Sequence, residues 1–113
     1  HGRTQVHLFS YLGHTPSVRA LLAAPTRINI RDHLGWTPIL AAAFGGHTDI
    51  LRLLVEAGGD LGVRAADGSG VLRLAAVGGH RGVMAFAVAR GVREGGWGDE
   101  YIQRTIEGQN GGK

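Results

Sequence analysis

The residues most suited to chemistry in this chain are histidines that follow a glycine at a fixed interval. Gly13-His14, Gly46-His47 and Gly79-His80 are each separated by 33 positions. Imidazole is a common metal ligand, so such a ladder suggests an ion site. If each pair belongs to one of several stacked units, however, neighbouring pairs lie about 10 Å apart, whereas a metal–nitrogen bond is about 2 Å long. We therefore expect no metal site.

The sequence offers no recognisable catalytic site. It contains no cysteine, and none of its three serines (Ser10, Ser17 and Ser69) lies in a G-x-S-x-G elbow. The segment 67–70, Asp-Gly-Ser-Gly, resembles a phosphate-binding loop but lacks the spacing and the lysine of that loop. The nine acidic residues are scattered, so nothing predicts paired carboxylates. We expect no enzymatic activity, no catalytic residue and no cofactor.

Size and charge fit one globular domain and argue against two further classes of protein. The chain has 113 residues, 43% of them apolar, and no apolar run approaches the ~18 residues that span a bilayer. The net charge is +3, and the arginines are spread along the chain without a basic block or a known nucleic-acid-binding motif. We expect no membrane insertion and no binding of nucleic acid.

An internal repeat is the main organising signal. When the chain is shifted against itself by 33 residues, the three Gly-His pairs align, and so do Gly2, Gly35 and Gly68. Ala42-Ala43 aligns with Ala75-Ala76, and no insertion is needed. Repeats of this length are typical of solenoids, in which each unit buries its apolar face against the next unit.

The middle unit can be interpreted as a turn followed by two short helices. The turn is at 32–35, Thr37 is placed to cap a helix with its hydroxyl, and Pro38 suits the first helical position. This helix is predicted at 38–44 and is rich in alanine. Gly45-Gly46 ends it. A second helix is predicted at 48–56, with an apolar face made by Ile50, Leu53 and Leu54.

The middle unit also carries a set of residues in a characteristic order: Asp32-His33-Leu34-Gly35-Trp36-Thr37-Pro38-Ile39, Ala42-Ala43, Gly46-His47, Asp49-Ile50, Leu53-Leu54 and Ala57-Gly58. This set resembles an ankyrin repeat, and the period agrees with that family. The resemblance covers residues 2–92. It implies an all-α ankyrin-repeat helical solenoid with units at about 1–31, 32–64 and 65–92, and it gives the Gly-His pairs a structural role between helices.

The three units match the family unequally. The first keeps the histidine that follows the capping threonine, His7, whereas Leu40 and Arg73 stand at that position in the other two. In the third unit, Gly70-Val71 replaces Thr-Pro. We therefore expect its first helix to begin loosely, without a hydroxyl cap, a loss that costs about 1 kcal/mol.

The resemblance also implies where a partner binds. Ankyrin proteins contact partners through the turn tips and the exposed side of the first helices, on an extended concave face. The residues of this sequence at those positions are Tyr11, Leu12, His33, Leu34, Trp36, Phe44, Asp67, Ser69 and Val77. Aromatic residues at exposed sites are enriched among binding hot spots. The alternative is that Trp36 and Phe44 only pack against neighbouring units.

We therefore expect a protein–protein interaction module, a scaffold or adaptor with no catalysis of its own, that binds a protein partner as a monomer. The alternative is a regulatory or structural spacer segment of a larger protein such as an enzyme or a channel. The chain begins at His1 rather than methionine, so a fragment or processed form is expected. The cytoplasm is the expected location.

The last residues, 93–113, do not continue the repeat. A glycine-rich break at 95–98 precedes a segment, 99–107, whose apolar residues have helical spacing. The pattern fits either a short helix that caps the end of the stack or a linker. Residues 108–113 are expected to be disordered.

Overall fold

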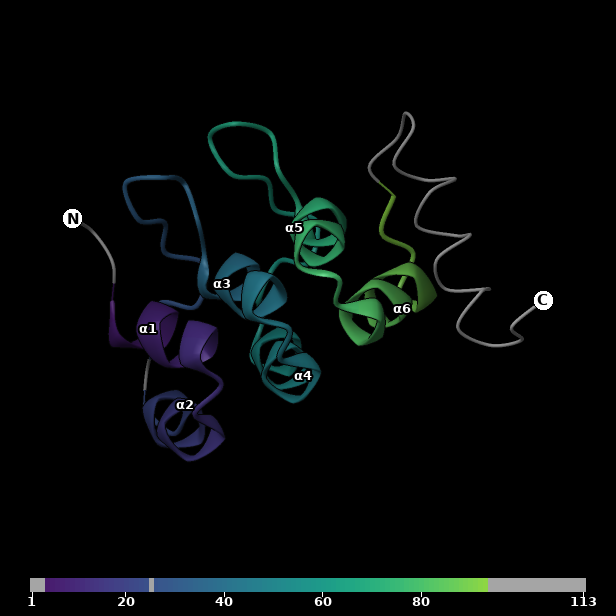
Figure 1. Cartoon of the computed structure of the whole chain (residues 1–113). Coiled ribbons are helices and arrows are strands. Elements are labelled where there is room, and N and C mark those ends of the chain that lie inside the picture. The colour runs from purple at the N-terminus through teal and green to yellow at the C-terminus, as the bar shows by residue number, and fades with distance from the viewer. Residues whose placement is uncertain (1–3, 25, 94–113) are drawn as a thin grey trace.

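The computed structural model describes residues 4–24 and 26–93, and within these ranges the fold is all-α (Figure 1). Its helices are α1 (Gln5–Leu12), α2 (Thr15–Leu22), α3 (Pro38–Gly45), α4 (Thr48–Glu56), α5 (Val71–Gly78) and α6 (Arg81–Ala89). An isolated antiparallel bridge joins Arg64 and Gly70. The break predicted at 95–98, the helix at 99–107 and the tail at 108–113 lie outside the described residues.

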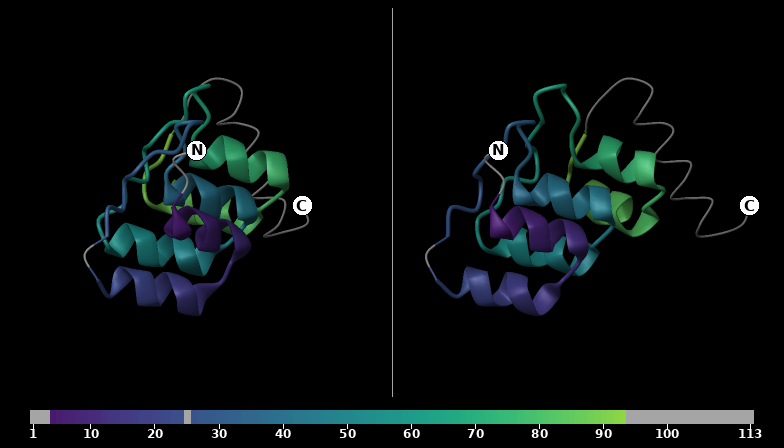
Figure 2. Two further views of the ribbon diagram at one scale, coloured as in Figure 1. Left: turned by 90° about the vertical axis from the view of Figure 1, so that its left-hand side faces the viewer. Right: turned by 60° about the vertical axis from the view of Figure 1, so that its left-hand side comes forward.

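The helices form two rows that follow the repeat. Helices α1, α3 and α5 make the inner row, in which α3 packs against both of the others. Helices α2, α4 and α6 make the outer row, and each packs against the inner helix that precedes it in the chain (Figure 2). The chain segments before α3 and α5 project to the same side of the stack (Figure 1). The structure is therefore a helical repeat fold, as the period predicts.

The first six residues of the central inner helix are buried. Residues 38–43 of α3 are all buried, and three of them are alanines, which let α1 and α5 approach closely. A helix that is apolar all round belongs in an interior. In α4, by contrast, Ile50, Leu51 and Leu54 are buried. The predicted apolar face was wrong in one residue, because Leu53 is only half-buried and Leu51 takes its place.

Proline and glycine set the bounds of the helices, close to where the sequence predicts them. Helix α3 begins at Pro38 and ends at Gly45, one residue beyond the prediction. The next residue, Gly46, has φ of 81°, a left-handed conformation that glycine adopts without steric cost. Helix α4 has the predicted bounds.

Histidines tie each unit to the one before it. The Nε2 atom of His47 lies 2.9 Å from the carbonyl oxygen of Tyr11, and that of His80 lies 3.0 Å from the carbonyl oxygen of Phe44. Both carbonyls belong to the last turn of an inner helix, where no intrahelical donor is available. Because a carbonyl can only accept, Nε2 carries the proton in both imidazoles. The Gly-His pairs of the second and third units thus connect each unit to the one before it.

Glycines make room for these imidazoles. A Cβ at Gly46 would lie 2.5 Å from Nδ1 of His80, and one at Gly45 would lie 2.5 Å from the carbonyl oxygen of Tyr11. A Cβ at Gly13 would collide with the His47 ring. Glycine is therefore required at these positions because the next unit approaches closely. At Gly13 and Gly46 the left-handed backbone is a second reason.

The predicted hydroxyl cap of α3 was wrong. Thr37 precedes the helix, but its Oγ1 is buried and has no hydrogen-bond partner among the described residues. At the equivalent position of the first unit, Oγ1 of Thr4 accepts from the His7 N–H (3.3 Å), and Nδ1 of His7 accepts from the Thr4 N–H (3.1 Å). This reciprocal capping box needs the imidazole. Leu40 replaces it in the second unit, so only the hydroxyl remains there.

The sequence also predicted that α3 has a side-chain cap and that α5 has none, and this contrast was wrong. Helix α5 begins after Gly70 without a side-chain cap, as expected. Because α3 also lacks one, the two helices start alike, and among the three inner helices of the described residues only α1 has a side-chain cap. How firmly α5 begins stays a prediction.

Substitution of Thr4 and Thr37 by valine should change stability in opposite directions. We expect Thr4→Val to lower the free energy of unfolding by about 1 kcal/mol, since it removes a working cap. Thr37→Val should raise it by up to about 1 kcal/mol, because the isosteric methyl replaces a buried hydroxyl that bonds to nothing. Urea denaturation followed by circular dichroism measures both values. A loss of similar size in both variants would show that the Thr37 hydroxyl is in fact satisfied.

Gly46→Ala and Gly79→Ala form a matched pair that isolates the contact between units. Both glycines have similar left-handed φ values, 81° and 74°. An added Cβ meets the His80 ring at Gly46 but nothing within 4 Å in the described structure at Gly79. We expect backbone strain of about 1–2 kcal/mol in both variants, with a further loss of about 1–3 kcal/mol in Gly46→Ala from overpacking. Equal losses in thermal or urea unfolding would contradict the close approach.

Candidate functional site

The sequence-predicted contact residues differ in how much of each reaches the surface. Tyr11, Leu34 and Leu12 are 44%, 46% and 57% exposed, and Val77 is 71% exposed. His33 and Asp67 are also exposed, at the tips of their turns. Trp36 and Phe44 are half-buried, whereas Ser69 is buried and presents little to a partner. We use the term concave face for the surface made by the turns 33–36 and 66–69 and the exposed sides of α1, α3 and α5.

Three aromatic side chains from two units meet on the concave face. The Tyr11 ring of α1 and the Phe44 ring of α3 are stacked, with centroids 6.0 Å apart and planes inclined by 16°. The Trp36 ring, from the turn before α3, meets the Phe44 ring edge-on at 5.4 Å. Both geometries are favourable for aromatic pairs. Tyr11 and Phe44 occupy the same position of successive units, so the repeat itself brings them together.

A hollow of about 270 Å³ lies beside these rings, between the first and second units. The described residues that line it are His7, Tyr11, Asp32, Trp36, Ala41 and Phe44. Three predicted residues therefore share one hollow. His33, Leu34, Asp67 and Val77 lie elsewhere on the concave face, and Leu12 lies at the end of α1.

Two polar side chains fix the hollow's geometry. The Nδ1 atom of His7 accepts from the Thr4 N–H, so the ring is neutral and its Nε2–H donates to the carbonyl oxygen of Trp36 at 2.7 Å. The carboxylate of Asp32 is almost fully buried, and its Oδ1 accepts from the N–H groups of Leu34 (2.9 Å) and Trp36 (3.0 Å). His7 thus holds the Trp36 backbone from the first unit, and Asp32 holds it from within the second.

Sequence reasoning did not assign His7 or Asp32 to this surface. Both residues belong to structural motifs, so nothing in the sequence distinguishes their role at a hollow. Leu8 is 42% exposed and occupies the same repeat position as Ala41, which lines the hollow on the side of the first unit. In α1 this position therefore lies on the side away from the second unit, and Leu8 is not part of the hollow.

The turn of the third unit is held by Asp67 and has no aspartate at the position equivalent to Asp32. The Oδ1 atom of Asp67 accepts from the Ser69 N–H at 2.9 Å. This bond, followed by a bond from the Ser69 hydroxyl and by the charge of Arg73, lowers the pKa of the Asp67 carboxyl. The carboxylate is therefore ionised at neutral pH on a fully exposed turn. It offers a negative charge to a partner, without an aromatic ring beside it.

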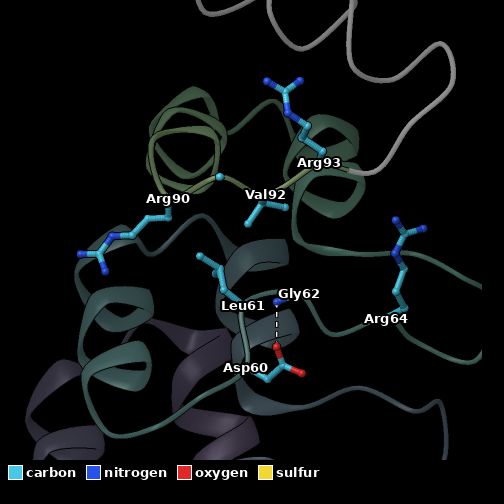
Figure 3. Close-up of a pocket in the computed structure, with 8 residues that line it drawn as sticks. Asp60, Leu61, Gly62, Arg64, Arg90, Val92 and Arg93 are labelled. Atoms are coloured by element: carbon cyan, nitrogen blue, oxygen red, sulfur yellow. Dashed lines mark hydrogen bonds between the residues drawn. The ribbon is translucent and has the colours of Figure 1, made fainter.

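A second hollow, of about 410 Å³, lies near the end of the described chain (Figure 3). Its lining includes Arg64, Arg90 and Arg93, which suggests a site for an anion. In Figure 3 the three side chains extend away from one another, so their guanidinium groups do not converge. The Arg90 guanidinium instead lies 4.6 Å from the centre of the Phe86 ring. This arrangement does not clamp a phosphate.

The described residues give no support to two other kinds of site. Within residues 4–24 and 26–93, no group of three or more histidine, cysteine, aspartate or glutamate side chains is arranged to hold a metal ion. In the same ranges, every helix is too short or too polar to cross a bilayer.

Comparison with known proteins agrees with the geometry. A family model described as ankyrin repeats, in three copies, matches residues 2–93. A search of curated proteins finds no significant match. Ankyrin repeats generally mediate protein–protein interactions and are typically not catalytic. Because the family model spans most of the 113 residues, the chain belongs to the ankyrin-repeat family.

Proposed function

We propose that the chain is a recognition module that binds a protein partner on its concave face, centred on the first and second units. The observation that carries this proposal is the aromatic cluster of Tyr11, Trp36 and Phe44 beside a hollow on that face. Solenoids of this kind use corresponding positions of successive units as one extended surface.

Packing alone does not account for this cluster. Trp36 and Phe44 rest against the buried core, but both remain partly exposed and both line the hollow. Tyr11, which stacks on Phe44, has 44% of its surface in solvent, and Leu34, in the turn before α3, has 46%. Rigid aromatic side chains with partly exposed faces supply contact area at little entropic cost. Their truncation often costs about 2 kcal/mol or more in binding.

A structural spacer is the second candidate function, and it requires different features of the structure. A spacer needs the stacked core and the imidazole ties, but it has no use for an apolar surface that solvent can reach. The exposed Tyr11 and Leu34 favour recognition over the spacer, since apolar patches usually mark contact sites.

Substitution of exposed residues on the concave face should abolish capture of partners without unfolding the stack. We suggest Tyr11→Ser with Leu34→Ser, because both side chains are exposed and contribute little to the core. The matched control is Arg52→Ser with Glu56→Ser on the exposed side of α4. Affinity purification with mass-spectrometric readout compares the variants with the unaltered chain. For a partner so identified, we expect the dissociation constant to rise about 30-fold in the concave-face variant.

Circular dichroism and thermal unfolding first establish that both double variants are folded. Partners retained by the control and lost by the concave-face variant would support recognition at this surface. Retention by both variants would place the contact elsewhere. If the unaltered chain captures nothing that the controls lack, the spacer becomes the better interpretation.

A further inference from the structure

Helices α1 and α2 form one end of the described stack (Figure 1), and the 33-residue register identifies the side chains on its outer side. The second unit brings the equivalent positions against the first unit. Ala41 lines the hollow between the two units, and a Cβ at Gly45 would lie 2.5 Å from the Tyr11 carbonyl oxygen. In α1 the equivalents of Ala41 and Gly45 are Leu8 and Leu12. Both leucines therefore lie on the side of α1 away from the second unit.

The outer row of helices follows the same register. A Cβ at Gly82 would lie 3.2 Å from Oγ1 of Thr48. The centre of the Phe86 ring lies 5.5 Å from the Arg52 guanidinium, so these two positions of α6 reach back to α4. In α2 the equivalent residues are exposed and apolar, and with the two leucines they make the surface that we term the open end: Leu8, Leu12, Pro16 and Ala20.

The open end is unusual for the last unit of a stack. A solenoid needs a polar outer face on its terminal unit to stay soluble. None of the four residues of the open end is polar or charged, and Leu8 and Leu12 are 42% and 57% exposed. Exposed apolar surfaces usually mark contact sites. Three occupants suit such a surface in principle: a further repeat unit, a second copy of the chain, or a partner of another kind.

A further repeat unit fits the open end poorly. In the second and third units, a Cβ at Gly45 or Gly78 would lie 2.8 or 2.5 Å from Nε2 of the histidine that ties the unit to the one before it. The first unit carries Leu12 at this position. Its histidine serves its own unit instead, because Nδ1 of His14 accepts from the Ser17 N–H at 3.3 Å and so caps α2. A unit stacked in the same way would meet a leucine where the repeat requires glycine.

Charge argues against a second copy and in favour of an acidic partner. The first unit, residues 1–31, contains four arginines and no acidic residue. The third unit, residues 65–92, contains three arginines and one aspartate. Two stacks that meet end to end at the open end would therefore bring like charges together. A partner with acidic side chains gains where a second copy loses, because complementary charge favours association.

We propose that the open end binds an amphipathic helix of a partner, with apolar side chains on one face and acidic side chains beside them. Leu8 and Leu12 are one turn apart on α1, which is the spacing that such a helix reads with its own apolar residues. Arg19 is exposed and directly precedes Ala20 in α2, so it lies at the rim for the acidic side chains. This surface is separate from the concave-face hollow, and the proposal goes beyond the recognition proposed there.

Nuclear magnetic resonance titration of the isotope-labelled chain with synthetic peptides tests the proposal. The probe is a helical peptide of about 18 residues with leucine along one face and glutamate on the other. One control peptide has lysine in place of every glutamate. A second has the same composition as the probe but leucines spread around the helix. The readout is the amide signals of α1 and α2, and we expect saturable shifts with a dissociation constant on the order of 100 µM for the glutamate peptide alone.

Variants of exposed residues locate the contact. Leu8→Ser with Leu12→Ser should weaken the glutamate peptide at least about 10-fold, because two exposed apolar side chains are lost. Arg19→Glu should weaken it about threefold, and added salt should weaken it in the unaltered chain. Val77→Ser, which removes an exposed apolar side chain from the third unit, is the matched control and should change nothing. Circular dichroism first shows that every variant is folded.

Four outcomes would overturn the proposal. Equal binding of the lysine peptide would remove the acidic requirement. Equal binding of the peptide with spread leucines, or no saturable shift in α1 and α2, would show that the open end takes no amphipathic helix. Self-association in analytical ultracentrifugation that Leu8→Ser with Leu12→Ser abolishes would identify a second copy as the occupant. A rise in the urea midpoint on joining a copy of residues 35–67 ahead of Gly2 would identify a further repeat unit.

Discussion

The stack depends on a hydrogen bond that crosses each boundary between units. The imidazoles of His47 and His80 donate to carbonyls in the last turn of the preceding inner helix, where the helix itself has no donor to offer. The bond satisfies a group that would otherwise need water, and it fixes the distance between inner helices. Glycine must then stand where a ring passes: Gly13 and Gly45 face the ring of His47, and Gly46 faces the ring of His80.

The aromatic hollow is a consequence of this spacing. Because the imidazole of the second unit reaches back to the carbonyl of Tyr11, the last turns of α1 and α3 lie side by side. Tyr11 and Phe44, at the same repeat position, then stack at 6.0 Å. His7 adds a second bond between the same two units, from its ring to the Trp36 carbonyl. The surface that we propose for recognition is thus held by the same kind of bond that holds the stack, and it needs no flexible loop to form.

The sequence predicted the parts of the fold that follow from period and backbone chemistry. The 33-residue repeat predicted the family, and proline with paired glycines placed α3 and α4 to within one residue. It could not predict that the Thr37 hydroxyl bonds to nothing among the described residues, because the capping box of the first unit also needs the ring nitrogen of His7, and Leu40 has no such group. For the site, the family resemblance predicted that Tyr11, Trp36 and Phe44 lie on one face. The ring geometry, the hollow and the buried wall provided by Asp32 depend on packing between units, which no local pattern encodes.

The second and third units differ because the imidazole that donates to the turn carbonyl, that of His7, is present only in the first unit. In the second unit, the Trp36 carbonyl accepts from both the Asp32 N–H and His7. In the third unit, the equivalent Ser69 carbonyl accepts from the Ala65 N–H, and Leu40 has no donor to add.

The turns of units two and three are joined instead by a guanidinium. The Arg31 Nη1 atom donates to the carbonyls of Gly35 and Arg64, at 2.8 and 2.7 Å. A backbone bond from the Ala66 N–H to the Leu34 carbonyl oxygen (3.1 Å) also joins the two turns, and Ser69 is buried where Trp36 reaches the surface. Of the predicted contact residues, the third unit exposes Val77 and Asp67, and the aromatic cluster of the described residues lies at the boundary that His7 reinforces.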